Sequence, residues 1–481
     1  MAKVIIQSLR DVYIMKQSKE FNLRINKSFF SSLLYLPKVF FDTRKTGDFI
    51  ARLNDTQRVQ NVIRHLITNT AIDIFGILIS ISFLFYYSCE LALLCLLISP
   101  VIFYIIFRFN KKTIASQKEV MQSYSNNEAN YIDIIRGIDA IKTFGKQDVF
   151  LRKGTLSFEN FQDTIFNLGK VNIKITLYSG LALVFFLVAI VSFSSYHVLI
   201  KQIKMGELMA VIGISGSLLG SITNLALASI PIEEAKVAFE RMFEYASISG
   251  ERLEGTKIKH LNEIEIQQLD FRFKGRSKLL ENITLKLRRG EITCILGESG
   301  SGKTTLTEIL QKNYQQESGK ITINKKILLE DFSIADWRKK ISVVPQNIPL
   351  FNATVLDNII LCENIDHHKL NDLFDLGFEK FIKGLPQGLM KIVGEEGINL
   401  SGGQKQLLGW MRALYHHPEF LILDEPTSSL DKENRYFIYK VIEQIKSDKI
   451  ILIISHNLED LERISNHIFY LKNKILLKHE I

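Results

Sequence analysis

Long stretches without charged residues constrain this chain more than any other feature of its sequence. Residues 74–107 contain only one charged residue, Glu90, and residues 175–200 and 208–232 contain no Asp, Glu, Lys or Arg. As one helix, the first stretch would be about 50 Å long, against about 30 Å for the hydrocarbon core of a bilayer. It therefore predicts two membrane-spanning helices that are joined by a turn near Glu90. The four predicted spans are about 70–88, 91–108, 175–200 and 206–230.

The basic residues around these stretches predict their orientation. Arg64 precedes the first pair of spans, Arg108 and Lys111 follow it, and Lys174 precedes the third span. Because cytoplasmic flanks are enriched in Lys and Arg, these ends are predicted to be cytoplasmic. Residues 1–24 mix charges and lack the apolar core of a signal peptide. We expect a multi-pass protein of the cytoplasmic membrane, in contact with the lipid bilayer.

Composition supports a membrane part joined to a soluble part. The chain is 47% hydrophobic and 23% charged, with a net charge of +9. Its basic residues lie mainly beside the apolar runs, so lipid headgroups explain them better than nucleic acid, and no nucleic-acid partner is expected. There is no C-x-x-C pair, and no His cluster lies beside the four cysteines, so neither a metal site nor a disulfide framework is predicted for them. These are Cys89, Cys95, Cys294 and Cys362.

The sequence pattern changes after a polar linker at residues 246–262. Short β-rich apolar runs at 291–296, 341–344, 420–423 and 449–454 alternate with helical segments. That alternation is typical of an α/β domain with a largely parallel sheet. The predicted fold is thus an α-helical transmembrane bundle over residues 1–245, with cytoplasmic helical extensions, followed by an α/β domain over 263–481.

A glycine-rich loop is the first motif of this second domain that predicts a chemical function. Residues 297–304, GESGSGKT, fit the pattern G-x-x-x-x-G-K-[ST], follow the strand-like run 292–296 and precede a predicted helix at 305–311. Strand, loop and helix in this order predict a P-loop NTPase, whose backbone N–H groups surround phosphates. Lys303 is predicted to pair with the β- and γ-phosphates of ATP, and Thr304 to bind Mg²⁺.

Two carboxylates end another apolar strand, in FLILDE at 420–425. Asp424 is predicted to hold Mg²⁺, and Glu425 to orient or deprotonate the attacking water. A second glycine-rich turn, LSGGQ at 400–404, lies about a hundred residues beyond the phosphate loop. If it sits at the far end of the domain, it cannot reach the same phosphate, which suggests a nucleotide shared between two copies of the domain.

Six motifs in this order resemble the nucleotide-binding domain of ATP-binding cassette (ABC) transporters, over about residues 264–472. They are residues 297–304, Gln346 in VVPQ, residues 400–404, residues 420–425, residues 429–431 (SLD) and His456 in IISH. The resemblance implies that Gln346 bridges Mg²⁺ or water to the membrane helices and that His456 donates to the γ-phosphate. It also implies that Ser401 and Gly403 contact the nucleotide held by a partner subunit, and that Asp431 communicates between the two sites.

The predicted catalytic residues are therefore Glu425, His456 and Gln346, and the predicted Mg²⁺ ligands are Thr304, Gln346 and Asp424. The predicted ATP-binding residues are Phe273, Gly297, Glu298, Ser299, Gly300, Ser301, Gly302, Lys303, Thr304, Thr305, Ser401, Gly402, Gly403, Gln404 and Asp431. Two of the chain's residues depart from the family pattern. Phe273 stands where many exporters have a tyrosine that stacks on adenine, and Leu407 stands where an arginine is common. A phenyl ring can still stack, so ATP hydrolysis is expected to survive.

The N-terminal half resembles exporters of this family. Residues 36–48 and 52–55 are similar to their first cytoplasmic loop, and residues 135–144 to the second. The sequences of these segments are most similar to those of bacterial peptide and bacteriocin exporters. Such exporters have six membrane helices per subunit, whereas four are predicted here, so the first two are expected to be missing or reduced to a tail within residues 4–23. No N-terminal peptidase domain is expected.

The main hypothesis is an ATP-driven exporter of a peptide or bacteriocin. It would work as a homodimer, or with a second half-transporter, and use ATP and Mg²⁺ at sites shared across the dimer. The alternatives are a lipid or drug exporter, and a truncated or split protein that binds ATP without transporting.

Overall fold

The computed structural model describes residues 2–44, 46–244, 248, 250–251, 254–361, 363–456 and 462–479. Parts of the predicted linker 246–262 and Cys362 lie outside the described residues. The chain forms two compact units, one of residues 1–36 and 40–250 and the other of residues 37–39 and 251–481.

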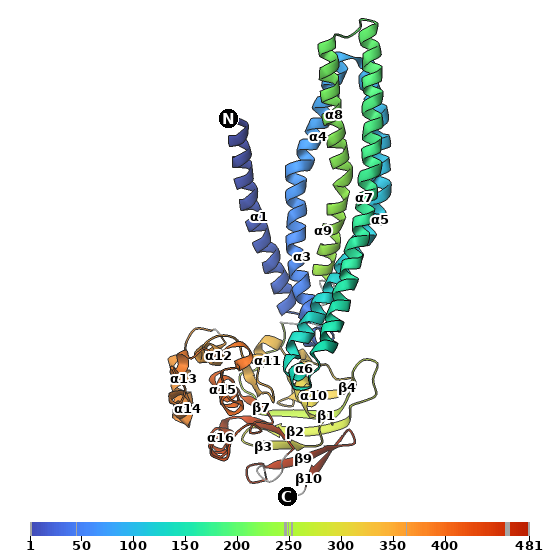
Figure 1. Ribbon diagram of the computed structural model, residues 1–481. Coiled ribbons are helices and arrows are strands. Elements are labelled where there is room, and N and C mark those ends of the chain that lie inside the picture. The colour runs from blue at the N-terminus through green and yellow to red at the C-terminus, as the bar shows by residue number, and fades with distance from the viewer. Residues whose placement is uncertain are drawn as a thin grey trace. The chain divides into compact units, whose positions relative to one another are not determined.

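The first unit is helical (Figure 1). Its helices are α1 (Ala2–Leu34), α2 (Lys38–Asp42, which begins in the second unit's residues), α3 (Thr46–His65), α4 (Ala71–Tyr87), α5 (Cys89–Arg136), α6 (Ile138–Thr143), α7 (Gln147–Leu199), α8 (Met205–Leu227) and α9 (Ser229–Met242). Residues 2–34 contain neither Gly nor Pro, the two residues that most disfavour a helix. The segment 4–23, predicted as a tail, accordingly lies within the 33-residue helix α1.

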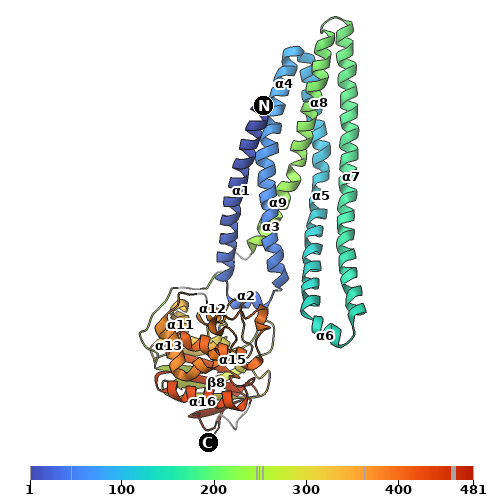
Figure 2. The same cartoon turned by 60° about the vertical axis from the view of Figure 1, so that its left-hand side comes forward.

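The apolar stretches pack against one another within this unit. α5 and α7 run side by side and are joined by the short α6, as both views show (Figure 1, Figure 2). The buried core draws on α4, α5, α7 and α8, through side chains such as Leu84, Leu91, Phe186 and Leu218. Many other large apolar side chains of these helices are exposed, for example Phe75 and Phe185. A helix that is apolar on its outward face suits a lipid environment.

Three helices among the described residues are long and apolar enough to cross a membrane. They are Val59–Tyr87, Gln147–Leu199 and Met205–Met242, and a shorter apolar helix covers Cys89–Val101. The predicted span 91–108 lies within α5, where the side chains of residues 102, 105 and 106 are outside the description. α4 ends at Tyr87 and α5 begins at Cys89, so the chain turns just before Glu90.

A charged cluster ties α3 to the end of α9 in the first unit. Arg52 is buried, donates to the carbonyl oxygen of Arg241 and lies 2.7 Å from Glu244 Oε2. Arg44 donates to the other carboxylate oxygen of Glu244 at 3.1 Å. Hydrogen bonds from Arg44 and Arg52 lower the pKa of Glu244 to about 2.

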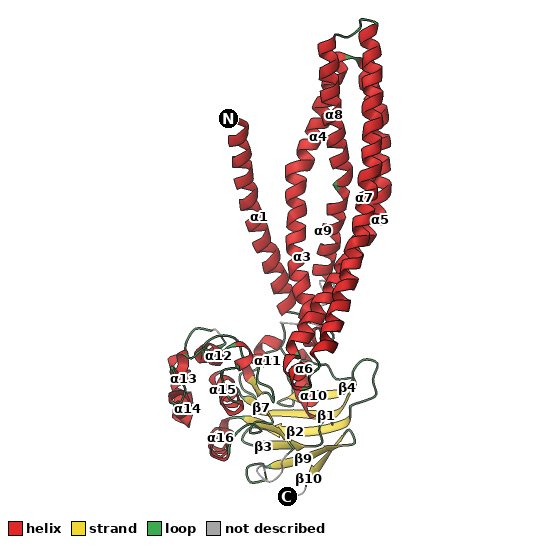
Figure 3. Cartoon of the chain, viewed as in Figure 1, coloured by secondary structure: helices red, strands yellow, loops and turns green. Residues whose placement is uncertain are grey.

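The second unit contains two sheets, which are the yellow arrows of Figure 3. The strands are β1 (Glu263–Phe271), β2 (Leu280–Arg288), β3 (Ile292–Leu296), β4 (Ser318–Ile323), β5 (Ile327–Leu328), β6 (Ile341–Val344), β7 (Phe420–Asp424), β8 (Ile450–Ser455), β9 (His467–Lys472) and β10 (Ile475–His479). The helices are α10 (Lys303–Leu310), α11 (Ile334–Lys340), α12 (Val355–Ile360), α13 (His367–Leu373), α14 (Glu379–Lys383), α15 (Gly402–Tyr415) and α16 (Lys432–Ile445).

The larger sheet has the order β10-β9-β3-β8-β7-β6, and only the β9–β10 pair is antiparallel. Its central strands are buried on both faces, which explains their unbroken apolar sequences. In β8, Ile451 and Ile453 point into one core while Ile450 and Leu452 point into the other. The smaller sheet is antiparallel, in the order β2-β1-β4-β5.

Candidate functional site

The order of the parallel strands decides where the predicted catalytic segments meet. β3, β8, β7 and β6 are neighbours in the sheet, and their carboxyl ends share one edge. The glycine loop follows β3, His456 follows β8, Asp424 ends β7, and Gln346 comes two residues after β6. In open α/β sheets this edge is where ligands bind.

A cavity of about 260 Å³ lies at this edge of the sheet, and we call it the phosphate cavity. It is lined by residues from all four of these segments. The lining residues are Leu279, Ser299, Gly300, Gly302, Lys303, Thr304, Thr305, Gln346, Asp424, Glu425 and His456. The structure thus brings the predicted Mg²⁺ ligands and catalytic residues together with most of the glycine loop, whereas the predicted residues Gly297, Glu298 and Ser301 of that loop do not line the cavity.

The glycine loop needs its glycines for backbone reasons. Gly300 has φ +81° and Gly302 has φ +106°, both in the left-handed region that side chains disfavour. A Cβ on Gly302 would also lie 2.9 Å from a methyl carbon of Leu280, whereas one on Gly300 would meet no atom within 4 Å. The loop is therefore shaped by backbone conformation at both positions and by close packing at the second.

Lys303 and Thr304 begin α10 at the end of this loop. The Lys303 ammonium donates to the carbonyl oxygens of Gly297 at 2.7 Å and Glu298 at 2.8 Å, which holds the cation inside the loop. The Thr304 hydroxyl donates to Asp424 Oδ2 at 3.1 Å. Burial is the main reason why the pKa of Asp424 is raised, although the Thr304 hydrogen bond opposes it.

Glu425 and His456 form a pair at the mouth of the cavity. His456 Nδ1 lies 2.8 Å from Glu425 Oε1; the histidine side chain is 72% exposed and that of Glu425 only 12%. The backbone of Glu425 has φ +51°, an uncommon value for a residue with a side chain. Its N–H donates to the carbonyl oxygen of Ile454 in β8 at 2.9 Å.

The side chains of the phosphate cavity fit a nucleotide with Mg²⁺. The hydroxyl of Thr304, a carboxylate oxygen of Asp424 and the side-chain amide of Gln346 offer the oxygen ligands that Mg²⁺ prefers. In the same loop, although Ser301 does not line the cavity, Ser301 Oγ is buried and has no hydrogen-bond partner within the described part of the chain. A buried hydroxyl without a partner is costly, and a phosphate oxygen would satisfy it.

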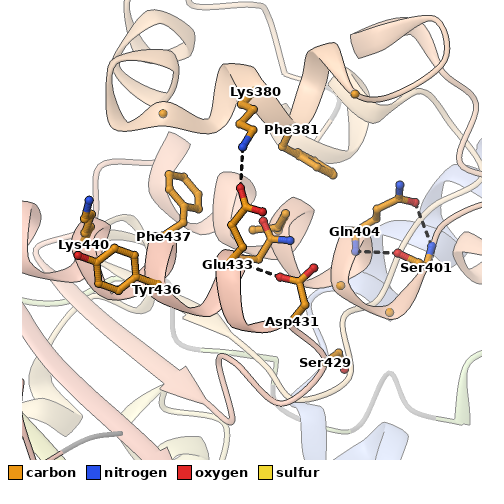
Figure 4. A pocket seen from close by; sticks show the side chains of 16 residues that line it. Lys380, Phe381, Ser401, Gln404, Ser429, Asp431, Glu433, Tyr436, Phe437 and Lys440 are labelled. Carbon is orange, nitrogen blue, oxygen red and sulfur yellow. Dashed lines mark hydrogen bonds and ion pairs between the residues drawn. The ribbon is translucent and has the colours of Figure 1, made fainter.

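The LSGGQ segment lies in a different cavity, of about 830 Å³, which we call the signature cavity (Figure 4). Ser401 is the N-cap of α15: its hydroxyl accepts from the Gln404 backbone N–H, and the Gln404 side chain accepts from the Ser401 N–H at 3.0 Å. Asp431 caps α16 by accepting from Asn434 N–H at 2.8 Å. Lys380 reaches across from α14 to Glu433 at 2.7 Å.

Most of the predicted site residues therefore line one of the two cavities, and four line neither: Phe273, Gly297, Glu298 and Ser301. Ser401, Gly402, Gly403, Gln404 and Asp431 line the signature cavity, and none of them is among the residues that line the phosphate cavity. Phe273 lines neither cavity. Its ring meets the rings of Phe271 and Tyr314 edge-on, with centroids at 5.0 and 5.5 Å.

Some residues at these cavities escaped the sequence analysis. Leu279 lines the phosphate cavity directly before β2, and Lys380 and Phe381 line the signature cavity from α14. None of the three belongs to a motif. For Leu279 the only signal was its place beside Leu280 at the start of a strand, where apolar residues are normally core residues.

Comparison with known proteins matches both halves of the chain. The family model "ABC transporter transmembrane region" matches residues 1–222, and the model "ABC transporter" matches residues 280–428. The solved structure of a bacterial Atm1-family ABC exporter with ATP bound has a TM-score of 0.91 at 19% identity, and covers 98% of this chain and 84% of that one. The predicted fold class, a transmembrane helical region followed by an ABC ATPase domain, is confirmed.

Three curated relatives are similar over almost the whole chain. The alpha-hemolysin translocation ATP-binding protein HlyB of Escherichia coli is 28% identical over 98% of this chain and 67% of its own length. The cyclolysin secretion/processing ATP-binding protein CyaB of Bordetella pertussis is 26% identical over 95% and 65%. The ATP-dependent lipid A-core flippase of Photobacterium profundum is 25% identical over 92% and 76%. The chain spans about two thirds of the length of the two toxin-secretion relatives.

Proposed function

We propose that this chain, an ABC transporter of the exporter type with a transmembrane region and an ABC ATPase domain, couples ATP hydrolysis to the export of a peptide across the cytoplasmic membrane. The ATPase assignment follows from the domain itself. The observation that carries the proposal is the phosphate cavity, where Lys303, Thr304, Asp424, Glu425 and His456 converge from separate strands.

In this proposal each group of the phosphate cavity has one task. The loop N–H groups and the Lys303 ammonium bind the phosphates, because a helix N-terminus and a cation both stabilise negative charge. Thr304, Gln346 and Asp424 would hold Mg²⁺, which neutralises developing charge on the phosphates when it is bound.

Glu425 and His456 act on the water and the terminal phosphate. Glu425 accepts the proton of the attacking water or orients that water, and its hydrogen-bonded neighbour His456 fixes the direction of the carboxylate. His456 is mostly exposed, and when both of its ring nitrogens carry a proton, Nδ1–H donates to Glu425 while Nε2–H is accessible to donate to the γ-phosphate. Hydrolysis in the cavity therefore depends on positioned side chains of this chain.

A dimer explains why the signature cavity is separate from the phosphate cavity. Ser401 is exposed at the N-terminus of a 14-residue helix, where hydroxyl and N–H donors suit a phosphate, yet it lines a cavity without Lys303 or Asp424. We infer that it binds the nucleotide held by a second subunit. Two subunits would then share two ATP sites.

The peptide substrate rests on the relatives. Two of them are described by the translocation or secretion of protein toxins, and one by the flipping of lipid A-core. A polypeptide is the substrate class indicated by the names of the two toxin-secretion relatives, and a lipid is the second candidate because of the flippase.

The test compares Glu425→Gln with the wild-type chain reconstituted in proteoliposomes. If Glu425 acts as the general base, turnover should fall by roughly 10²–10⁴-fold while ATP still binds. The control is Glu281→Gln, the same chemical change at a carboxylate that pairs with Lys474 at 2.9 Å and lines neither cavity. Undiminished hydrolysis in Glu425→Gln would refute its assignment. ATP-dependent uptake of labelled peptides supports a peptide exporter, whereas movement of a labelled lipid between leaflets alone would establish the second candidate.

A further inference from the structure

Two large polar side chains are buried on the inner face of α15, the helix that begins at the LSGGQ segment. Gln406 is 3% exposed and Trp410 is completely buried. They are four residues apart, so they lie on the same face of the helix, one turn from each other. A buried polar side chain of this kind needs a hydrogen-bond partner.

Both side chains donate to the turn that follows β7. Gln406 Nε2 donates to the carbonyl oxygen of Glu425 at 2.8 Å, and Trp410 Nε1 donates to that of Pro426 at 3.1 Å. The amide oxygen of Gln406 also accepts from the backbone N–H of Ser429 at 2.9 Å. One face of α15 therefore holds two consecutive carbonyl groups of this turn and a third backbone group three residues beyond them.

This turn carries the carboxylate of the phosphate cavity in an unfavourable backbone conformation. Glu425 has φ +51°, which a residue with a Cβ adopts only when its surroundings enforce it. The hydrogen bonds donated by Gln406 and Trp410, and the one that the Ile454 carbonyl oxygen accepts from the Glu425 N–H, act on the backbone of Glu425 and Pro426. Because the side chain leaves from the same Cα, the backbone conformation sets where the carboxylate points.

We propose that Gln406 and Trp410 are positioning residues, which make the aim of the Glu425 carboxylate depend on the position of α15. The proposal rests on the function proposed above, in which Ser401 at the start of α15 binds the partner's nucleotide. Engagement of that nucleotide moves or fixes α15, and α15 in turn fixes the carboxylate that acts on the subunit's own nucleotide. Each ATP site thereby reports its occupancy to the other through a single helix.

The chain offers a matched control, because it has only two tryptophans and both donate from a fully buried indole to a backbone carbonyl. Trp337 Nε1 donates to Leu310 O at 2.8 Å and lines neither cavity. Trp410→Phe and Trp337→Phe each remove one N–H and leave one carbonyl oxygen without its donor. Both changes are expected to lower the midpoint of thermal unfolding by similar amounts.

Hydrolysis should separate the two variants in the reconstituted full chain. Trp410→Phe is expected to lower kcat at least about 10-fold while the KM for ATP stays within about twofold, and Trp337→Phe should keep both constants within about twofold. Gln406→Leu, which removes both hydrogen bonds of the amide, should show the same selective loss of kcat. Equal kcat values for Trp410→Phe and Trp337→Phe would overturn the proposal, since a purely structural role predicts that result.

Fluorescence gives a second measurement that leaves α15 intact. In Trp337→Phe, Trp410 is the only tryptophan, so all tryptophan emission comes from α15. Because docking of α15 on the partner's nucleotide alters the surroundings of Trp410, this emission should change when a non-hydrolysable ATP analogue is added. Adding Ser401→Arg, which blocks docking on the partner's nucleotide, should abolish the change although the analogue still binds. An emission change that persists in Ser401→Arg would contradict the coupling. Absence of any ATP hydrolysis by the wild-type chain would instead refute the proposed function, so the two failures are distinguishable.

Discussion

The phosphate cavity and the signature cavity are built from the same domain in opposite ways. The first collects charged side chains at the carboxyl ends of four neighbouring parallel strands. The second lies at the start of α15 and offers a capped helix terminus whose serine is exposed. The difference teaches how the proposed dimer would divide the work: each subunit would supply the hydrolytic chemistry for its own nucleotide and a binding surface for the nucleotide of its partner.

Mixed dimers provide the strongest test of this division. Lys303→Ala and Ser401→Arg homodimers should each lose hydrolysis by on the order of 10²-fold or more, because each site loses a group that stabilises the transferred phosphate. A dimer of one Lys303→Ala and one Ser401→Arg subunit keeps one complete site, so hydrolysis should rise above that of either homodimer. It should stay below half of the wild-type rate, because α15 of the Ser401→Arg subunit is not docked and the Glu425 carboxylate of that site is not fixed. ATPase assays of differently tagged, co-purified subunits measure it. An inactive mixed dimer would show that each subunit uses its own LSGGQ segment.

Metal dependence should belong to the phosphate cavity alone. Thr304→Val removes the hydroxyl that lies 3.1 Å from Asp424 Oδ2, whereas Thr304→Ser keeps it. Thr304→Val is expected to raise the Mg²⁺ concentration needed for half-maximal hydrolysis by about 10–100-fold. Titration of ATPase activity with Mg²⁺ measures this, and equal requirements in the two variants would remove Thr304 from the metal site.

The glycines of the two cavities should differ in their effect on stability. Gly302→Ala places a Cβ 2.9 Å from Leu280 at φ +106°, so a cost of about 1–3 kcal/mol is expected. Gly402 lies at the start of α15, and its Cβ would meet Ser429 at an ordinary 3.4 Å. Gly402→Ala should therefore leave the thermal midpoint almost unchanged.

Gly300→Ala separates the cost of the positive φ from the cost of the contact with Leu280, which act together at Gly302. It has the same kind of backbone, φ +81°, without a neighbouring atom within 4 Å. Its destabilisation should lie between those of the other two variants. If it equals that of Gly302→Ala, the contact with Leu280 contributes nothing.

The antiparallel sheet supplies a reference that lies outside both cavities, with the smallest expected effect. Asp270 accepts hydrogen bonds from Asn282 N–H, Lys278 and Ser318, which lower its pKa to about 2 from 3.8. Since the folded pKa is depressed, the stabilisation is fully present above about pH 4 and is lost as the pH falls towards 2.

Asp270→Asn should therefore melt at a lower temperature than the wild-type chain at pH 5, and the difference should shrink towards pH 3. Thermal unfolding across this range measures it. A difference that is independent of pH would show that the Asp270 charge is not what stabilises the sheet.

Much of the ATPase domain could be predicted because its signals are local. The four strands predicted at 291–296, 341–344, 420–423 and 449–454 correspond to β3, β6, β7 and β8 within one residue. A short, fully apolar run between polar segments suffices for a buried parallel strand. The helix over residues 4–23 could not be predicted in this way, because its polar and apolar residues are mixed and give no such signal. These residues belong to α1.

The sequence by itself determined the P-loop ATPase domain and predicted its phosphate-binding chemistry, since the loop, Lys303, Thr304 and the carboxylates belong to short motifs. Only the tertiary structure decided which motifs share a cavity, because the order β3-β8-β7-β6 pairs strands that are far apart in the chain. It also revealed Gln406 and Trp410, because in the sequence they look like ordinary core residues of a helix. Their significance lies in hydrogen bonds to Glu425 and Pro426, and such partners are set by packing rather than by sequence spacing.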